Sequence, residues 1–140
     1  MDLYRRELMI LGVGAFAASA TTGLPAFASR AEEEIMALTG GADIIDGGVS
    51  LIAPEIAENG NSVAIDVSAE GASSITLFGD GNPEPIMATI NFGPLSPTRG
   101  AVTRVRLHQT QNVIALAKME DGTWHRASAK VKVTIGGCGG

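Results

Sequence analysis

The chain has little of the material from which disulfide frameworks and metal sites are built. Its 140 residues include one cysteine and two histidines. A single cysteine has no internal disulfide partner, and a structural metal site needs three or four ligands. His108 and His125 have no cysteine or carboxylate at metal-like spacing, so we assign them structural or solvent-facing roles. We expect neither a metal nor a cofactor.

Basic charge is also scarce: the chain has 10 lysines and arginines against 15 acidic residues, which gives a net charge of -5. The broad basic field that nucleic-acid binding needs is therefore missing. The length suits one domain. The apolar fraction of 45% is enough for a core.

Residues 1–28 have the composition of a secretory leader. Arg5-Arg6 precedes an apolar run over residues 8–27, and the small-x-small sequence Ala26-Phe27-Ala28 follows. The arginine pair resembles a twin-arginine leader, which predicts export to the periplasm. The alternative is a membrane anchor, which Pro25 and several glycines in the run disfavour. We expect cleavage after Ala28.

The mature chain should start with a short helix. Ser29 and Glu32 fit a capping box, three acidic residues follow one another from Glu32, and Gly40-Gly41 predicts the end. So short a helix needs tertiary support.

From Gly47 onward the apolar residues repeat every second position between turn signals. About seven such runs follow one another without helical spacers, which parallel crossovers would need. We predict an all-β, immunoglobulin-like antiparallel β-sandwich over residues 29–135. In the last run Val131, Val133 and Ile135 should face inward. The expected strands cover residues 49–53, 62–68, 74–78, 86–92, 102–107, 112–119 and 124–135.

The last five residues, Gly136, Gly137, Cys138, Gly139 and Gly140, carry the only thiol. Glycine has no Cβ, so a glycine run is predicted to be a slender, flexible arm. An ordinary frayed terminus is the alternative. However, an exposed free thiol in an oxidising compartment needs an explanation. No cation in the local sequence lowers the pKa of the Cys138 thiol, so we expect its activation inside partner enzymes.

These residues resemble a known family, SoxY, the sulfur-carrier subunit of the periplasmic thiosulfate-oxidising (Sox) system. The resemblance rests on the ending VKVTIGGCGG at residues 131–140, on APEIAENG at residues 53–60, on TRVRL at residues 103–107 and on the leader. It covers nearly the whole mature chain.

The resemblance implies a non-catalytic carrier that pairs with a second small subunit, SoxZ, and holds pathway intermediates covalently on Cys138. It implies that a c-type cytochrome complex, SoxAX, oxidatively joins thiosulfate to the thiol. A hydrolase, SoxB, then removes the terminal sulfone as sulfate. A sulfane dehydrogenase, SoxCD, is a further implied partner that can oxidise the remaining sulfane sulfur.

Other features remain open from the residues alone. Arg104 and Arg106 share one strand face, which is either solvated or a docking patch for partners. Trp124 fills either the core or a subunit interface. Three functions are distinguishable: a covalent sulfur carrier, a structural module tethered by a disulfide through Cys138, and a thiol enzyme or metallochaperone. The third function is disfavoured, because the sequence offers Cys138 no catalytic base and no further metal ligands.

Overall fold

The structure, a computed structural model, describes residues 26–135. This part of the chain forms helix α2 (Ala26–Thr39), followed by strands that are mostly short. None of the helices described is long and apolar enough to cross a membrane. The strands are β1 (Ile44–Asp46), β2 (Ser50–Ile52), β3 (Ile56–Ala57), β4 (Val63–Ser68), β5 (Ala72–Gly79), β6 (Ile86–Asn91), β7 (Gly100–Val105), β8 (Gln111–Met119) and β9 (Trp124–Val133).

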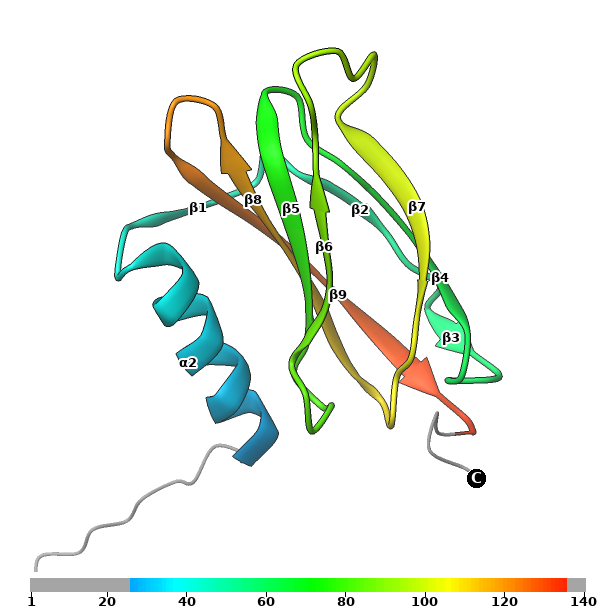
Figure 1. The fold of residues 1–140 in the computed structure, drawn as a ribbon. Helices are drawn as coiled ribbons and strands as arrows, with labels where there is room; N and C mark the ends of the chain where they lie inside the picture. The colour runs from blue at the N-terminus through cyan, green and yellow to red at the C-terminus, as the bar shows by residue number, and fades with distance from the viewer. Residues whose placement is uncertain (1–25, 136–140) are drawn as a thin grey trace, which may run out of the picture.

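The strands form two sheets that pack face to face, with α2 on the outside of the larger one (Figure 1). The larger sheet has the order β1-β9-β8-β5-β6, and β3 also pairs with β9. The smaller sheet has the order β2-β4-β7. Alternation places every second side chain between the sheets, as in β4, where Val63, Ile65 and Val67 are buried while the residues between them are exposed.

The predicted immunoglobulin-like β-sandwich is confirmed. The seven expected runs correspond to β2 and to β4 through β9, with ends that differ by a few residues. The alternating pattern identified these strands because each has one face against the core and one toward solvent.

Two short strands were not predicted, and both pair in parallel with β9. β1 aligns Ile44 with Trp124, and β3 aligns Ile56 with Lys132. We had excluded parallel pairing because helical spacers are absent. That reasoning was wrong, because the whole sandwich forms the connection between these strands and β9. Strands of two or three residues are too short to show a period, and the segment around β3 has the proline, asparagine and glycine content of a turn.

Helix α2 begins earlier than the sequence predicts. Ser29 lies inside the helix, which starts at Ala26, so Ser29 is not its N-cap as the capping box had suggested. The expected cleavage point after Ala28 also lies within α2, and cleavage there stays a prediction. The predicted end is confirmed, because Thr39 is the last helical residue and Gly40 and Gly41 follow with positive φ.

The helix is held by a second apolar cluster on the outer face of the larger sheet. Ile35 packs there with Phe78, Leu116 and Trp124, and all four side chains are buried. Trp124 therefore fills a core, but the one beneath α2 rather than the one between the sheets. Ile135 was expected to face inward and is 62% exposed, because β9 ends at Val133 and Ile135 lies beyond the sandwich.

Candidate functional site

The candidate reactive residue, Cys138, and its four neighbouring glycines lie outside the described residues. The predictions made for them therefore stay predictions. The structure does describe the point at which this segment joins the sandwich. We call residues 132–135 the arm root, and they follow the part of β9 that is paired with β8.

Strand β9 changes partners just before the arm root. Its antiparallel pairing with β8 ends where Gln111 lies opposite Val131. Beyond that point β3 takes over and pairs in parallel with Lys132 and Val133. Figure 1 shows β3, the start of β4 and the end of β9 at the same end of the sandwich.

The segment that contains β3 holds the arm root as far as its last residue. The Thr134 amide donates to the Ala57 carbonyl at 3.1 Å, and the Gly60 amide donates to the Ile135 carbonyl at 2.8 Å. The Thr134 hydroxyl donates to the Glu58 carbonyl at 3.0 Å. These bonds fix the chain up to Ile135, three residues before Cys138.

The opposite edge of the arm root is bound by a loop that follows β7. The Val133 amide donates to the Thr110 hydroxyl oxygen at 2.9 Å. The loop is itself tied to the β3 segment, because the Leu107 amide donates to the Gly60 carbonyl at 2.8 Å. Gly60 thus connects Leu107 and Ile135 through its own two backbone groups.

This arrangement brings together segments that are distant in the sequence. Residues 53–60 and residues 103–107 are two of the three stretches of the mature chain that carried the family resemblance. Both meet the third, the end of β9, through Gly60. Sequence analysis identified the stretches but gave no indication that they form one structural unit.

A buried amide fixes the loop beside the arm root. Asn82 is 4% exposed, and its Nδ2 donates to the Arg106 carbonyl at 2.9 Å. Its Oδ1 accepts from the His108 amide at 2.9 Å and from Gln111 Nε2 at 2.8 Å. Asn82 was not among the predicted site residues, because a buried hydrogen-bond network leaves no local signal in the sequence.

Arg104 and Arg106 are both exposed near the arm root. The register pairs Arg104 with Ala64, and Arg104 Nη1 donates to Ser62 Oγ at 3.3 Å, so Arg104 lies on the outer face of the smaller sheet. Val102 shares that face and is 70% exposed. That the two arginines dock a partner stays a prediction.

The two histidines lie at different ends of the molecule. His125 Nδ1 is 3.1 Å from the Gly47 carbonyl oxygen, near the start of β9, whereas His108 lies in the loop after β7. Within residues 26–135, no three histidine, cysteine or carboxylate side chains are grouped so that they could hold a metal ion.

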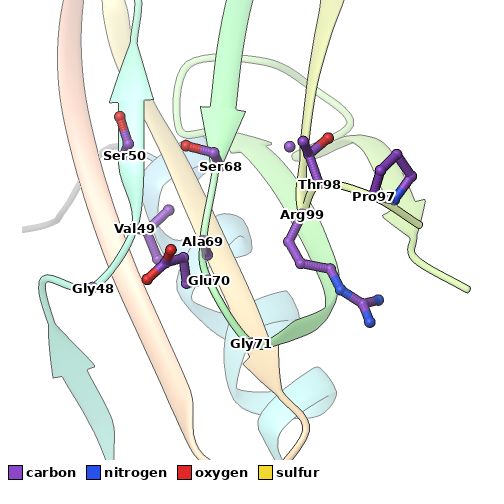
Figure 2. Close-up of a pocket in the computed structure, with 11 residues that line it drawn as sticks. Gly48, Val49, Ser50, Ser68, Ala69, Glu70, Gly71, Pro97, Thr98 and Arg99 are labelled. Carbon is purple, nitrogen blue, oxygen red and sulfur yellow. The ribbon is translucent and has the colours of Figure 1, made fainter. Parts of the chain in front are cut away.

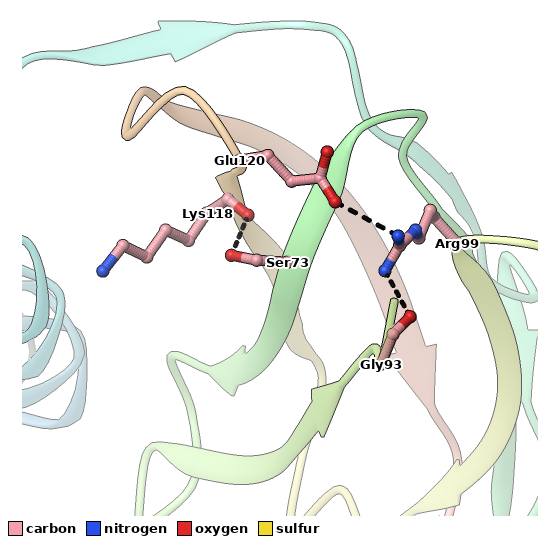
Figure 3. Close-up of polar contacts among 5 residues, drawn as sticks. All are labelled: Ser73, Gly93, Arg99, Lys118 and Glu120. Atoms are coloured by element: carbon pink, nitrogen blue, oxygen red, sulfur yellow. Dashed lines mark hydrogen bonds and ion pairs between the residues drawn. The ribbon is translucent and has the colours of Figure 1, made fainter. Parts of the chain in front are cut away.

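A hollow of about 840 Å³ (Figure 2) lies where Ser68 pairs with Gly100, at the end of the β4–β7 pair that is opposite to the arm root. It is lined by Ser68 and Gly100, at the end of β4 and the start of β7. Its arginine, Arg99, is engaged by the Glu120 carboxylate at 3.1 Å and by the Gly93 carbonyl at 3.0 Å (Figure 3).

At the same far end, hydrogen bonds from Thr123 stabilise the charged form of Asp121 and lower the pKa of its carboxyl group. The Thr123 hydroxyl lies 2.6 Å and its amide 2.9 Å from Asp121 Oδ1. These groups shape the turn between β8 and β9 and are remote from the arm root.

Comparison with known proteins points to one family. A family model described as "Sulfur oxidation protein SoxY" matches residues 35–138, a range that includes Cys138. The solved structure of the sulfur carrier protein SoxY from Chlorobium limicola f thiosulfatophilum is 32% identical to this chain. The alignment covers 77% of this chain and 99% of that chain, with a TM-score of 0.66.

Other solved structures share the fold at lower identity. A superoxide reductase (neelaredoxin) from Ignicoccus hospitalis is 17% identical over 75% of this chain and 91% of its own, with a TM-score of 0.55. At that identity the likeness extends to the sandwich alone. No curated protein sequence matches the chain.

Proposed function

Because the chain belongs to the SoxY family of sulfur oxidation proteins, we propose that it is a non-catalytic carrier that holds sulfur intermediates covalently on Cys138. The single observation that carries this proposal is the extent of the family match. The match runs from helix α2 through the whole sandwich and ends at the cysteine itself. The arm root supports it, because it provides a fixed base close to that cysteine.

The proposed cargo chemistry uses only the Cys138 thiolate. In loading, the thiolate and thiosulfate form a sulfur–sulfur bond, giving Cys–S–S–SO₃⁻, and two electrons pass to a cytochrome partner. In release, water attacks the terminal sulfone, giving sulfate and a cysteine persulfide. The carrier supplies a nucleophilic sulfur for bonds of this kind, which thiolates form and break reversibly. The partner enzymes supply the oxidant and activate the water.

The partners follow from the family and are part of the proposal. They are a SoxZ subunit in a heterodimer, a SoxAX cytochrome complex, a SoxB hydrolase and a SoxCD sulfane dehydrogenase. The twin-arginine-type leader supports a periplasmic location. Co-expression with the SoxZ-type subunit from the same organism should give a one-to-one complex by size exclusion and native mass spectrometry, whereas two separate species would contradict the heterodimer.

Intact-mass spectrometry of the protein from oxidised periplasm, before and after a reductant, tests the carrier function. We expect reducible additions of sulfur or thiosulfate confined to the peptide that contains Cys138. The Cys138→Ser variant should fold normally and carry none. A thiol found only free, or only in a stable disulfide with another protein, would contradict the carrier and favour a tether.

A further inference from the structure

The short distance between the arm root and Cys138 limits where a partner enzyme can bind. The Ile135 carbonyl is held by the Gly60 amide at 2.8 Å, and Cys138 is the third residue after it. A fully extended chain spans at most about 3.6 Å per residue, so the Cys138 backbone reaches about 11 Å from Ile135.

The far end of the sandwich lies beyond that distance. Strand β9 has 10 residues, and at about 3.4 Å per residue it is roughly 30 Å long. The thiol therefore cannot reach the hollow around Ser68 and Gly100. Any enzyme that takes this thiol into its active site must contact the end of the sandwich that carries the arm root.

Two arginines add basic charge to this end, where Lys132 of the arm root is also exposed. We call Ser62, Arg104 and Arg106 the arginine face. Arg104 Nη1 donates to Ser62 Oγ at 3.3 Å, and Arg106 directly precedes Leu107, whose amide donates to the Gly60 carbonyl at 2.8 Å. Gly60 also binds Ile135, so Leu107 and Gly60 connect the arginine face to the arm root.

The arginine side chains are available for a partner. In the part of the chain that the structure describes, the two ion pairs are Arg99 with Glu120 and Arg126 with Asp46, both elsewhere. Arg104 and Arg106 have no carboxylate partner among the described residues, in a protein whose net charge is -5.

Carboxylates near this end do not cancel the arginine face. Glu55 and Glu58 belong to the β3 segment beside the larger sheet. Asp66 lies opposite Val102, which is two residues before Arg104 on β7. Asp66 forms no ion pair with Arg104. The root end therefore presents the arginine face on the smaller sheet and a side of mixed charge on the larger sheet, where Glu55 and Glu58 lie near Lys132.

We propose that the arginine face is the docking surface for the enzyme that loads Cys138, and that this enzyme carries carboxylates beside the channel that admits the arm. The inference rests on the proposed function, in which Cys138 is the point of attachment. Complementary charge at the rim of an interface mainly raises the association rate and makes it sensitive to salt. The arginines thus act on encounter, not on the chemistry of the thiol.

The test measures loading of the full carrier, in complex with its partner subunit, by the oxidising cytochrome complex of the same organism. Thiosulfate is the substrate, and the mass increase on the Cys138 peptide gives the rate. The variant is Arg104→Gln/Arg106→Gln. The matched control is Lys118→Gln/Arg126→Gln, which removes two cations beside the turn between β8 and β9, at the opposite end of the sandwich from the arm root. A parallel reaction with tetrathionate, without enzyme, converts the thiolate to Cys–S–S–SO₃⁻ and releases thiosulfate.

We expect the arginine variant to lower kcat/KM about tenfold at low salt, with kcat unchanged, and to flatten the dependence on NaCl. At physiological salt the control should change kcat/KM less than about twofold, since exposed charges separated by more than about 8 Å are largely screened there. The tetrathionate reaction should stay at the wild-type rate in both variants.

Three results would overturn the docking face. An unchanged kcat/KM in the arginine variant, with normal loading of the wild type, would contradict the docking face but not the carrier function. An equal slowing of the tetrathionate reaction would show that the arginines attract the anion rather than a protein. Absence of any adduct on wild-type Cys138 would remove the carrier function and the docking face together.

Discussion

At the scale of single residues, the polar groups that matter most near the arm root are buried amides. Asn82 donates to the Arg106 carbonyl and accepts from the His108 amide and from Gln111 Nε2, and Gln111 Oε1 accepts from the Gly81 amide at 3.0 Å. A buried group that loses its partner costs more than the bond itself contributed. This pair therefore determines whether the loop after β7 stays in place.

Replacing Asn82 with alanine should reduce the free energy of unfolding by about 3 kcal/mol, because three groups lose their partner and buried unpaired groups cost about 1–3 kcal/mol each. Urea unfolding followed by circular dichroism measures the change. Asn91→Ala is the control, since Asn91 is exposed on β6, and it should change stability by less than about 0.5 kcal/mol. Equal effects would show that the Asn82 network contributes nothing specific.

At the scale of elements, α2 depends on the sheet beneath it. Its apolar residues alternate between a buried side, which includes Ile35 at 2% exposed, and an outer side, which includes Met36 at 66% exposed. A helix of 14 residues is marginal when isolated in water, so packing on Phe78, Leu116 and Trp124 supplies its stability.

Ile35→Ala should cost about 2–4 kcal/mol in the free energy of unfolding, because it opens a cavity beneath α2. The matched control, Met36→Ala, should be close to neutral, since that side chain already contacts solvent. Both are measured by urea unfolding. Similar losses in the two variants would contradict the assignment of the buried side.

The second element is the β3 segment, which holds the end of β9. Thr134→Val removes the 3.0 Å bond to the Glu58 carbonyl and keeps the side-chain shape. We expect a global loss of at most about 1 kcal/mol, with faster hydrogen exchange concentrated at the Thr134 and Gly60 amides. NMR-detected exchange measures this.

Thr98→Val, an exposed substitution at the far end, is the control for that experiment and should leave both amides at wild-type rates. Unchanged exchange in Thr134→Val would mean that the backbone bonds alone hold the arm root.

At the scale of the whole molecule, the position of the thiol depends on how much chain follows the last fixed residue. Deleting Gly136 and Gly137 places the cysteine directly after Ile135 and shortens its reach from about 11 Å to about 4 Å. We expect enzymatic loading to be lost while the reaction with tetrathionate persists, because a small reagent needs no channel. Mass spectrometry of the cysteine peptide follows both reactions.

Inserting two additional glycines beside Gly136 is the control for arm length. It should preserve loading, because the thiol can then extend farther from Ile135 than in the wild type. Loading of the shortened chain at the wild-type rate would show that reach does not limit access to the partner enzyme.

The sequence alone determined the general architecture and the candidate reactive atom. β4 shows why: Val63, Ile65 and Val67 alternate with exposed residues, and this local pattern encodes which face is buried. Cys138 could be identified without a structure, because it is the only cysteine and its glycine neighbours carry no side chains. The start of α2 and the short strands β1 and β3 were missed, since two or three residues carry no period.

Only the tertiary structure decided where the candidate reactive segment is attached and what surrounds its base. The bond between Gly60 and Ile135, the seat of Trp124 beneath α2 and the closeness of Arg106 to the arm root join residues that are far apart along the chain. Contacts of this kind arise when two sheets pack and their ends align. They leave no periodic or compositional trace in the sequence, so they become visible only once the chain is folded.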